Sequence, residues 1–346
     1  MNKLYTISLL PAIFFSNYTT AIELSKYLST SIEPTPKVRV TPRYPADAAR
    51  SSREGWAKFS FIIEKDGSVS NVITQETSGS KDLTLAAKKA LIKWQYEPAI
   101  ENGHPVQQCV NNVQFSFNMR KNGTSGATKR FKDLYIKTQE ALKEKNYSKT
   151  QALLARFKKI KYLHLSENNY LQLLHAQYAS EIGDPALQLS HLYSVKIPAG
   201  EKNNQQRLSV LKQRFLLEVK LNRLKYAYST FKSIEKIPQS QTELQSYKDI
   251  IKRIDNFIVS DKELIVNANI KKNDYWHHAL VRNEFSLTNI NGKLSKMDIR
   301  CANKRHVYSI ENNNTWKIPN SWQQCKLFIF GENDTSFNIV EYPFNT

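Results

Sequence analysis

The three cysteines of this chain, Cys109, Cys301 and Cys325, are its candidates for covalent cross-linking. Cys301 and Cys325 each fall in a segment expected to be a strand of one C-terminal region, so an oxidising compartment would let them form a disulfide. Closing a loop of that length stabilises the fold by roughly 3 kcal/mol on the chain-entropy model. Cys109 is left over, either as a buried thiol or as a cross-link to another chain. Its phase, shared with Val113 and Phe115, favours burial.

Two adjacent histidines, His277 and His278, are the best candidates for metal binding. In a strand, neighbouring side chains face opposite ways, so these two cannot easily share one ion, and we interpret them as ordinary surface or core histidines. The sequence also has no Gly-x-Ser-x-Gly elbow, phosphate-binding glycine loop or His-Glu-x-x-His helix. These features favour a binding protein over an enzyme, with no cofactor and no small-molecule substrate.

Residues 57–94 carry the patterns of a hairpin followed by a helix. Apolar residues alternate with polar ones over residues 57–64, Asp66-Gly67 is a favoured tight-turn pair, and residues 69–76 return as a second strand. From Lys81 to Trp94 apolar residues recur at steps of three and four, as in an amphipathic helix. Pro98 then ends the helical pattern, and Asn102-Gly103 supplies a turn into a further strand.

That further strand has one apolar and one polar face. The apolar side chains are Val113, Phe115, Phe117 and Met119, and the polar ones are Asn112, Gln114, Ser116 and Asn118. At a sheet edge, its unpaired backbone groups would capture an extended peptide by strand addition. We expect the partner-binding residues to be Val110, Asn112, Val113, Gln114, Phe115, Ser116, Phe117 and Asn118. The alternative is that residues 112–118 form a solvated sheet face without a partner.

In their order along the chain, these motifs resemble the C-terminal domain of TonB, the periplasmic protein that pulls on outer-membrane receptors. The motifs are Tyr44-Pro45, Glu54-Gly55-Trp56, Asp66-Gly67, Tyr96-Glu97-Pro98-Ala99, Asn102-Gly103 and the alternating strand that ends at Phe117. The resemblance covers residues 36–120. It implies that the last strand pairs with a short receptor segment, the Ton box, so that the partner is a TonB-dependent outer-membrane receptor or another TonB-system protein.

The N-terminus has the layout of a secretory signal peptide over residues 1–21. A short positive start precedes an apolar run over residues 4–16, and Thr19-Thr20-Ala21 offers small residues for cleavage after Ala21. The run is interrupted by Pro11 and is shorter than the roughly 20 residues that span a bilayer. We therefore predict a periplasmic protein, with an inner-membrane tether as the alternative. Without an anchor the chain could not transmit force alone, so an accessory or competing role is at least as well supported as direct energy transduction.

A helical region is expected over residues 129–258, after a polar, glycine-bearing boundary at residues 120–129. Breaks between helical runs fall at Asn146-Tyr147, Asp184-Pro185 and Lys225-Tyr226, about 40 residues apart, which is typical of helix-turn-helix repeats. The region resembles degenerate tetratricopeptide repeats, although the signature residues are largely missing. Such an array either binds a protein segment or holds the two end domains apart.

Residues 262–346 return to a two-residue period and indicate a small antiparallel β domain of no family that we recognise. The expected fold class is thus α+β: a TonB-like αββαβ domain, an α-helical repeat array and a small antiparallel β domain.

The net charge of the 346-residue chain is +19. A secreted chain without a recognition motif does not indicate nucleic acid, so the charge favours an acidic partner, peptidoglycan or anionic lipid, or serves solubility alone. An envelope scaffold that uses its helical repeats and basic surface on such partners is the alternative function.

Overall fold

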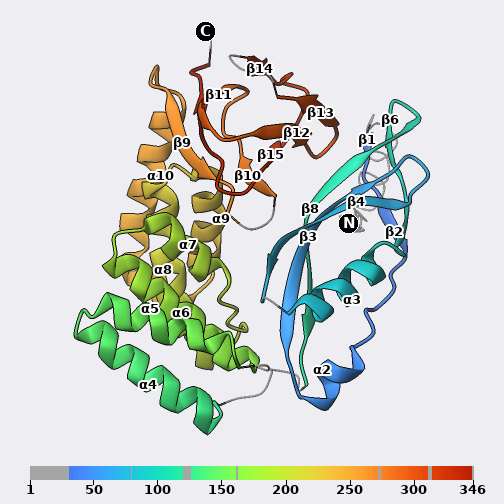
Figure 1. The fold of residues 1–346 in the computed structure, drawn as a ribbon. Coiled ribbons are helices and arrows are strands. Elements are labelled where there is room, and N and C mark those ends of the chain that lie inside the picture. The colour runs from blue at the N-terminus through green and yellow to red at the C-terminus, as the bar shows by residue number, and fades with distance from the viewer. Residues whose placement is uncertain are drawn as a thin grey trace, which may run out of the picture.

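The computed structural model describes residues 31–78, 80–119, 126–160, 163–271, 274–310 and 314–344. The expected signal peptide at residues 1–21 lies outside these ranges, as does part of the expected boundary at residues 120–129. The described chain is α+β, as predicted. An N-terminal unit of sheet and helix is followed by a helical middle region and by C-terminal antiparallel sheets (Figure 1).

The N-terminal unit is built around a three-stranded antiparallel sheet. Its strands are β3 (Gly55–Ile63), β4 (Val69–Thr77) and β8 (Gln108–Phe117), in the order β4-β3-β8. The hairpin turn between β3 and β4 requires glycine, because Gly67 has a φ of 81° and an added Cβ would meet the carbonyl oxygen of Tyr96 at 1.8 Å.

Helices α2 (Ala46–Arg50) and α3 (Lys81–Leu91) complete this unit, together with short peripheral strands. Leu83, Ala87 and Leu91 of α3 share one hydrophobic core with Phe59 and Phe61 of β3, so α3 covers one face of the sheet. The short strands are β1 (Ser31–Ile32), β2 (Thr35–Val38), β5 (Gln95–Glu97), β6 (Ala99–Glu101) and β7 (His104–Val106), which form the small sheets β1-β6-β7 and β2-β5.

The described part of the middle region contains three packed helix pairs and a further helix. The pairs are α4 (Lys129–Lys143) with α5 (Tyr147–Phe157), α6 (Leu165–Glu181) with α7 (Pro185–Tyr193), and α8 (Asn204–Lys220) with α9 (Leu224–Glu235); α10 (Leu244–Ile258) follows. Short 3-10 turns precede α8 and α10, at Glu201–Asn203 and Pro238–Glu243.

The same turn joins the two helices of every pair. Lys145, Gly183 and Asn222 have φ values of 55°, 71° and 56°. The next amide then bonds the carbonyl five residues back, at 2.9 Å in the first two turns and 2.7 Å in the third. The first two breaks lie where the sequence predicts them, but the third was predicted too late. Lys225 and Tyr226 already belong to the first turn of α9, because the chain reverses at Asn222.

Among the residues described in the C-terminal region, the strands form two four-stranded antiparallel sheets. One has the order β10-β15-β12-β13 and the other β14-β11-β16-β9. The strands are β9 (Leu264–Asn269), β10 (Tyr275–Ala279), β11 (Glu284–Asn291), β12 (Leu294–Arg300), β13 (Arg305–Ser309), β14 (Thr315–Lys317), β15 (Lys326–Gly331) and β16 (Ser336–Glu341). One core joins apolar residues of these sheets to Phe215, Ile234 and Ile254 of the last helices. The last helices and the C-terminal sheets therefore share one core.

Candidate functional site

Strand β8 lies at the edge of the N-terminal sheet. It pairs antiparallel with β3 from Gly55 opposite Phe117 to Ile63 opposite Gln108. Within the described chain, β3 is its only neighbouring strand in the sheet. In an antiparallel strand, alternate residues direct their N–H and C=O groups to opposite sides. The outer side of β8 therefore presents a row of backbone donors and acceptors to which a further strand can pair.

A bulge divides β8 and changes the faces that its side chains occupy. Val113 lies opposite Phe59, whereas Val110 lies opposite Phe61, so two residues of β8 stand against one of β3. Beyond the bulge, Val110 belongs with the N-terminal core, and Cys109 turns to the other face, opposite Ile62. Cys109 is buried, as the sequence predicts, but the reason is different. Cys109 does not share a face with Val113 and Phe115.

The apolar side chains of β8 support the strand from within. Phe115 packs edge-on against Trp94 and Phe59, with ring centroids 5.4 and 6.1 Å apart, and Phe117 packs against Tyr44 at 5.4 Å. These ring contacts anchor β8 to the hydrophobic core of the N-terminal unit.

The polar side chains lie on the other face. Asn112, Ser116 and Asn118 are exposed, and Gln114 is half-buried. Met119 was expected to continue the apolar face but is 42% exposed. The strand ends at Phe117, and the Met119 amide leaves the ladder to donate to Glu54 Oε1 at 2.9 Å.

Gln114 belongs to a row of side chains that crosses the sheet. It lies opposite Lys58 of β3, which in turn lies opposite Glu76 of β4, and Lys58 and Glu76 form an ion pair at 3.2 Å. Lys196, from the loop after α7, donates through Nζ to Gln114 Oε1 at 2.9 Å. Burial and the charge of Lys58 lower the pKa of Lys196. Lys196 was not predicted, because nothing in its local sequence indicates that the chain returns to β8.

The C-terminal sheets pack against part of the polar face of the N-terminal sheet. Arg300 donates to the Asn71 carbonyl at 3.0 Å and to Ser60 Oγ at 3.3 Å, and the Tyr275 hydroxyl donates to the Thr74 carbonyl. Arg300 itself is 1% exposed and is held by two hydrogen bonds to Asp298 Oδ2, at 2.8 and 3.0 Å. These contacts fall on β3 and β4, whereas Asn112, Ser116 and Asn118 of β8 are exposed.

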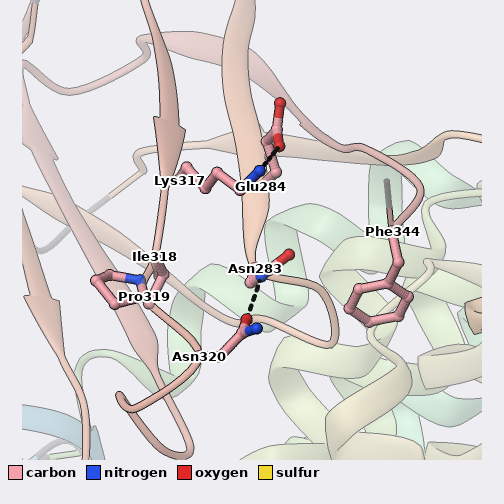
Figure 2. A pocket seen from close by; sticks show the side chains of 7 residues that line it. All are labelled: Asn283, Glu284, Lys317, Ile318, Pro319, Asn320 and Phe344. Carbon is pink, nitrogen blue, oxygen red and sulfur yellow. Dashed lines mark hydrogen bonds and ion pairs between the residues drawn. The ribbon is translucent and has the colours of Figure 1, made fainter. Parts of the chain in front are cut away.

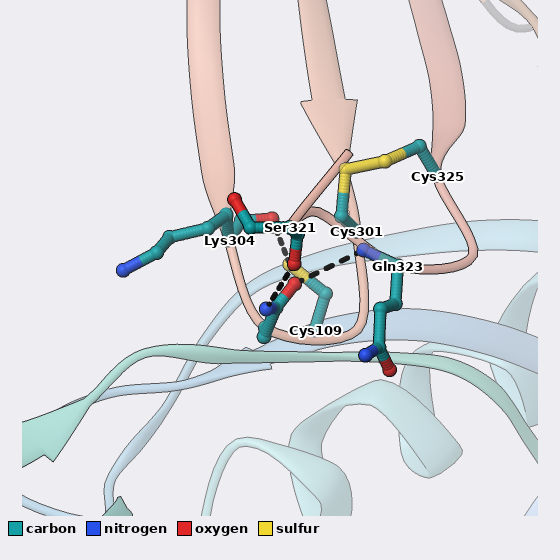
Figure 3. The surroundings of a disulfide bond; sticks show 7 residues. Cys109, Cys301, Lys304, Ser321, Gln323 and Cys325 are labelled. Atoms are coloured by element: carbon teal, nitrogen blue, oxygen red, sulfur yellow. Dashed lines mark hydrogen bonds between the residues drawn. A yellow bond between two sulfur atoms is a disulfide. The ribbon is translucent and has the colours of Figure 1, made fainter. Parts of the chain in front are cut away.

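Cys109 lies in this junction, beside a loop that a disulfide closes (Figure 3). Cys301 directly follows β12 and Cys325 directly precedes β15, and their sulfur atoms are bonded at 2.04 Å. The Cys109 thiol donates to the Lys304 carbonyl at 3.6 Å, and Lys304 also pairs with Glu101 at 3.3 Å. Burial raises the pKa of Cys109 to about 12, so the group is a protonated thiol at neutral pH.

The two histidines occupy different surroundings. His277 Nδ1 lies 3.0 Å from the Tyr226 hydroxyl, whereas His278 Nε2 lies 2.7 Å from Glu341 Oε1. Burial lowers the pKa of His277 well below its usual range, so this ring is neutral at pH 7. The described residues contain no group of three or more His, Cys, Asp or Glu side chains that could hold a metal ion.

A surface pocket lies on the C-terminal sheets, away from β8 (Figure 2). Its polar side chains partly satisfy one another: Lys317 pairs with Glu284 at 3.4 Å, and Asn283 donates to Asn320 at 2.7 Å. Phe344 forms one side of the pocket. Over the part of the chain that the structure describes, no helix combines the length and the apolar character needed to cross a membrane.

Comparison with known proteins identifies the N-terminal unit. Residues 40–119 match the family described as Gram-negative bacterial TonB protein C-terminal. A solution structure of the Pseudomonas aeruginosa TonB C-terminal domain is 26% identical, covers 26% of this chain and 89% of its own, and has a TM-score of 0.23. A structure of the TonB2 protein from Vibrio anguillarum is 25% identical, covers 35% of this chain and 100% of its own, and has a TM-score of 0.21. No curated protein matches the chain.

Proposed function

Since residues 40–119 form a TonB C-terminal domain, we propose that this envelope protein binds an extended peptide by strand addition to the outer edge of β8. The partner is a TonB-dependent outer-membrane receptor or another protein of the TonB system. The observation that carries the proposal is the position of β8, which has β3 on one side and no further strand of the described chain on the other.

The two ends of β8 have different surroundings. Near its start, the Cys109 thiol donates to the Lys304 carbonyl, so the C-terminal loop covers one face of the strand there. Further along, Asn112 and Ser116 are exposed on one face, while Phe115 is anchored in the core on the other. A peptide would therefore pair along residues 112–117, where Phe115 and Phe117 anchor the strand in the core and Asn112 and Ser116 are exposed.

The role of the protein in transport depends on whether it is free in the periplasm or anchored in the inner membrane. The N-terminal sequence pattern supports a periplasmic protein with its signal peptide cleaved after Ala21. In that form it would act as an accessory or competitor in energy transduction, because pulling force requires an anchor. Sequencing the N-terminus of the protein from the periplasmic fraction tests this, and a retained Met1 in a membrane fraction would favour direct transduction.

A pair of proline variants tests strand addition. Neighbouring residues of β8 direct their N–H groups to opposite sides of the strand. Proline has no N–H group, so one of the variants Val113→Pro and Gln114→Pro loses a hydrogen bond to β3, and the other loses a donor on the outer edge. Binding of Ton box peptides from receptors of the same cell is measured by calorimetry on the full chain, together with the melting temperature.

We expect the outward-donor variant to keep its melting temperature within a few degrees while losing most of its affinity. The other variant should melt earlier, because it breaks the β3–β8 ladder, and it controls for damage to the fold. Peptide affinity that is unchanged in both folded variants would show that the ladder groups of β8 do not hold the peptide.

A further inference from the structure

The side chains across the N-terminal sheet form a row of charges that stops at its open edge. Glu76, Lys58 and Gln114 are directly opposite one another on β4, β3 and β8, and they share the polar face. Lys58 is neutralised by Glu76 at 3.2 Å. A strand added to β8 would place one of its residues next in this row, with its Cβ about 5 Å from that of Gln114.

Lys196 is a cation that contacts the last side chain of this row, the neutral amide of Gln114. Lys196 donates to the Gln114 side-chain oxygen at 2.9 Å, and no carboxylate of the described chain forms an ion pair with it. Its other charged neighbours include Lys58, Arg207 and Arg214, which make the surroundings positive, and Glu76, which already pairs with Lys58. A half-buried ammonium group with only an amide acceptor is incompletely compensated.

We propose that the helical region completes the peptide site through Lys196, and that the preferred peptide carries Asp or Glu at the position beside Gln114. This inference rests on the proposed function. The peptide carboxylate would accept a charge-assisted hydrogen bond from Lys196 Nζ, and it would offset the charge of Lys196 as Glu76 offsets that of Lys58. The site is thus composite: the edge strand supplies the backbone ladder, and a loop of the helical region supplies selectivity.

The experiment combines variants of the full chain with paired peptides. The probes are Ton box peptides from receptors of the same cell, each compared with versions in which one Asp or Glu is replaced by Asn or Gln. Affinities are measured for the wild type, Lys196→Gln, Lys196→Arg and the control Lys252→Gln, which removes an equal charge from an exposed position of α10.

We expect one carboxylate-to-amide change to weaken binding to the wild type about fivefold, the effect of one partly exposed charged pair. That difference should vanish in Lys196→Gln and persist in Lys196→Arg and Lys252→Gln. An equal carboxylate preference in the wild type and in Lys196→Gln would overturn the role of Lys196 while leaving strand addition intact. Failure of every peptide to bind the wild type would overturn the proposed function and this inference with it.

Discussion

Lys326 is a buried cation at the junction of the three parts of the chain. It is 8% exposed and lies over the rings of Tyr226 and Phe328, at 5.6 and 5.4 Å. Burial and the charge of Lys58 lower its pKa to about 7, with Arg223 and Arg300 contributing and Glu76 opposing. The ring of His277 and the amine of Lys58 also face this junction, so the group sits among cations rather than opposite a carboxylate.

Stability should therefore depend on pH through Lys326. Above pH 7 the folded state holds this amine neutral, whereas the unfolded chain keeps it protonated up to about pH 10.5. Between pH 7 and about 10.5 the unfolded state then binds more protons than the folded state. The contribution of Lys326 to the free energy of unfolding therefore rises with pH across this window and is constant below pH 7. Relative to Lys326→Met, which does not titrate, the wild type should gain about 1 kcal/mol per pH unit between pH 7.5 and 9.5. Urea unfolding measures this, and parallel pH curves for the two proteins would contradict it.

The Cys109 thiol should resist alkylation in the folded protein. It is buried beside Lys304, and its pKa of about 12 leaves almost no thiolate at pH 8. Mass spectrometry after iodoacetamide treatment should show no labelling of the native chain and one labelled cysteine in urea, since Cys301 and Cys325 are bonded. Rapid labelling of Cys109 without denaturant would show that the junction is open in solution.

At the scale of elements, the repeated turn between paired helices fixes where each helix ends. Gly183 has a φ of 71° and open space where a Cβ would stand, so its role is conformational alone. Lys145 adopts a similar left-handed conformation in the turn of the first pair, with a φ of 55°. This conformation lowers the stability of the folded state because Lys145 has a Cβ, which glycine lacks.

Substitutions at these two turns should act in opposite directions. Gly183→Ala should destabilise the chain by about 1 kcal/mol, and Lys145→Gly should stabilise it by about 0.5 kcal/mol. Thermal unfolding of both variants beside the wild type gives the comparison. The same sign of change for both would show that the turn conformation is not the controlling factor.

Local patterns predicted most of the elements, and the reason is physical. Asp66-Gly67 and the alternation over residues 57–64 specify a hairpin because turn chemistry and a buried face agree there. The bulge in β8 could not be predicted in this way. It depends on the pairing register between β8 and β3, which cannot be read from the sequence of β8 alone. The bulge places Cys109 on the opposite face of the sheet from Val113.

At the scale of the whole molecule, the N-terminal sheet lies between α3 on one face and the C-terminal sheets on the other (Figure 1). Arg300 and Tyr275 contact residues more than two hundred positions away in the chain. Sequence periodicity reports only which face of an element is apolar. A polar face that is buried by another domain therefore looks the same in sequence as a solvated one.

The junction should make a large contribution to stability through Arg300. Arg300→Met would leave Asp298 to Arg305 alone and would remove the donors to Ser60 and Asn71. Breaking a buried ion pair in this way costs about 3 kcal/mol. Lys293→Met is the matched control, because its pair with Glu332 is exposed on both sides and should change stability by less than about 0.5 kcal/mol. Equal stabilities of the two variants in urea would contradict the assigned role of Arg300.

Hydrogen exchange of the β8 backbone amides, measured on the full chain with and without a Ton box peptide, shows whether a peptide pairs with this edge. Strand addition predicts that alternate amides over residues 112–117, those directed away from β3, become protected on binding, while those already bonded to β3 change little. A peptide that binds to saturation and leaves every one of these amides exchanging at its free rate would contradict capture at this edge.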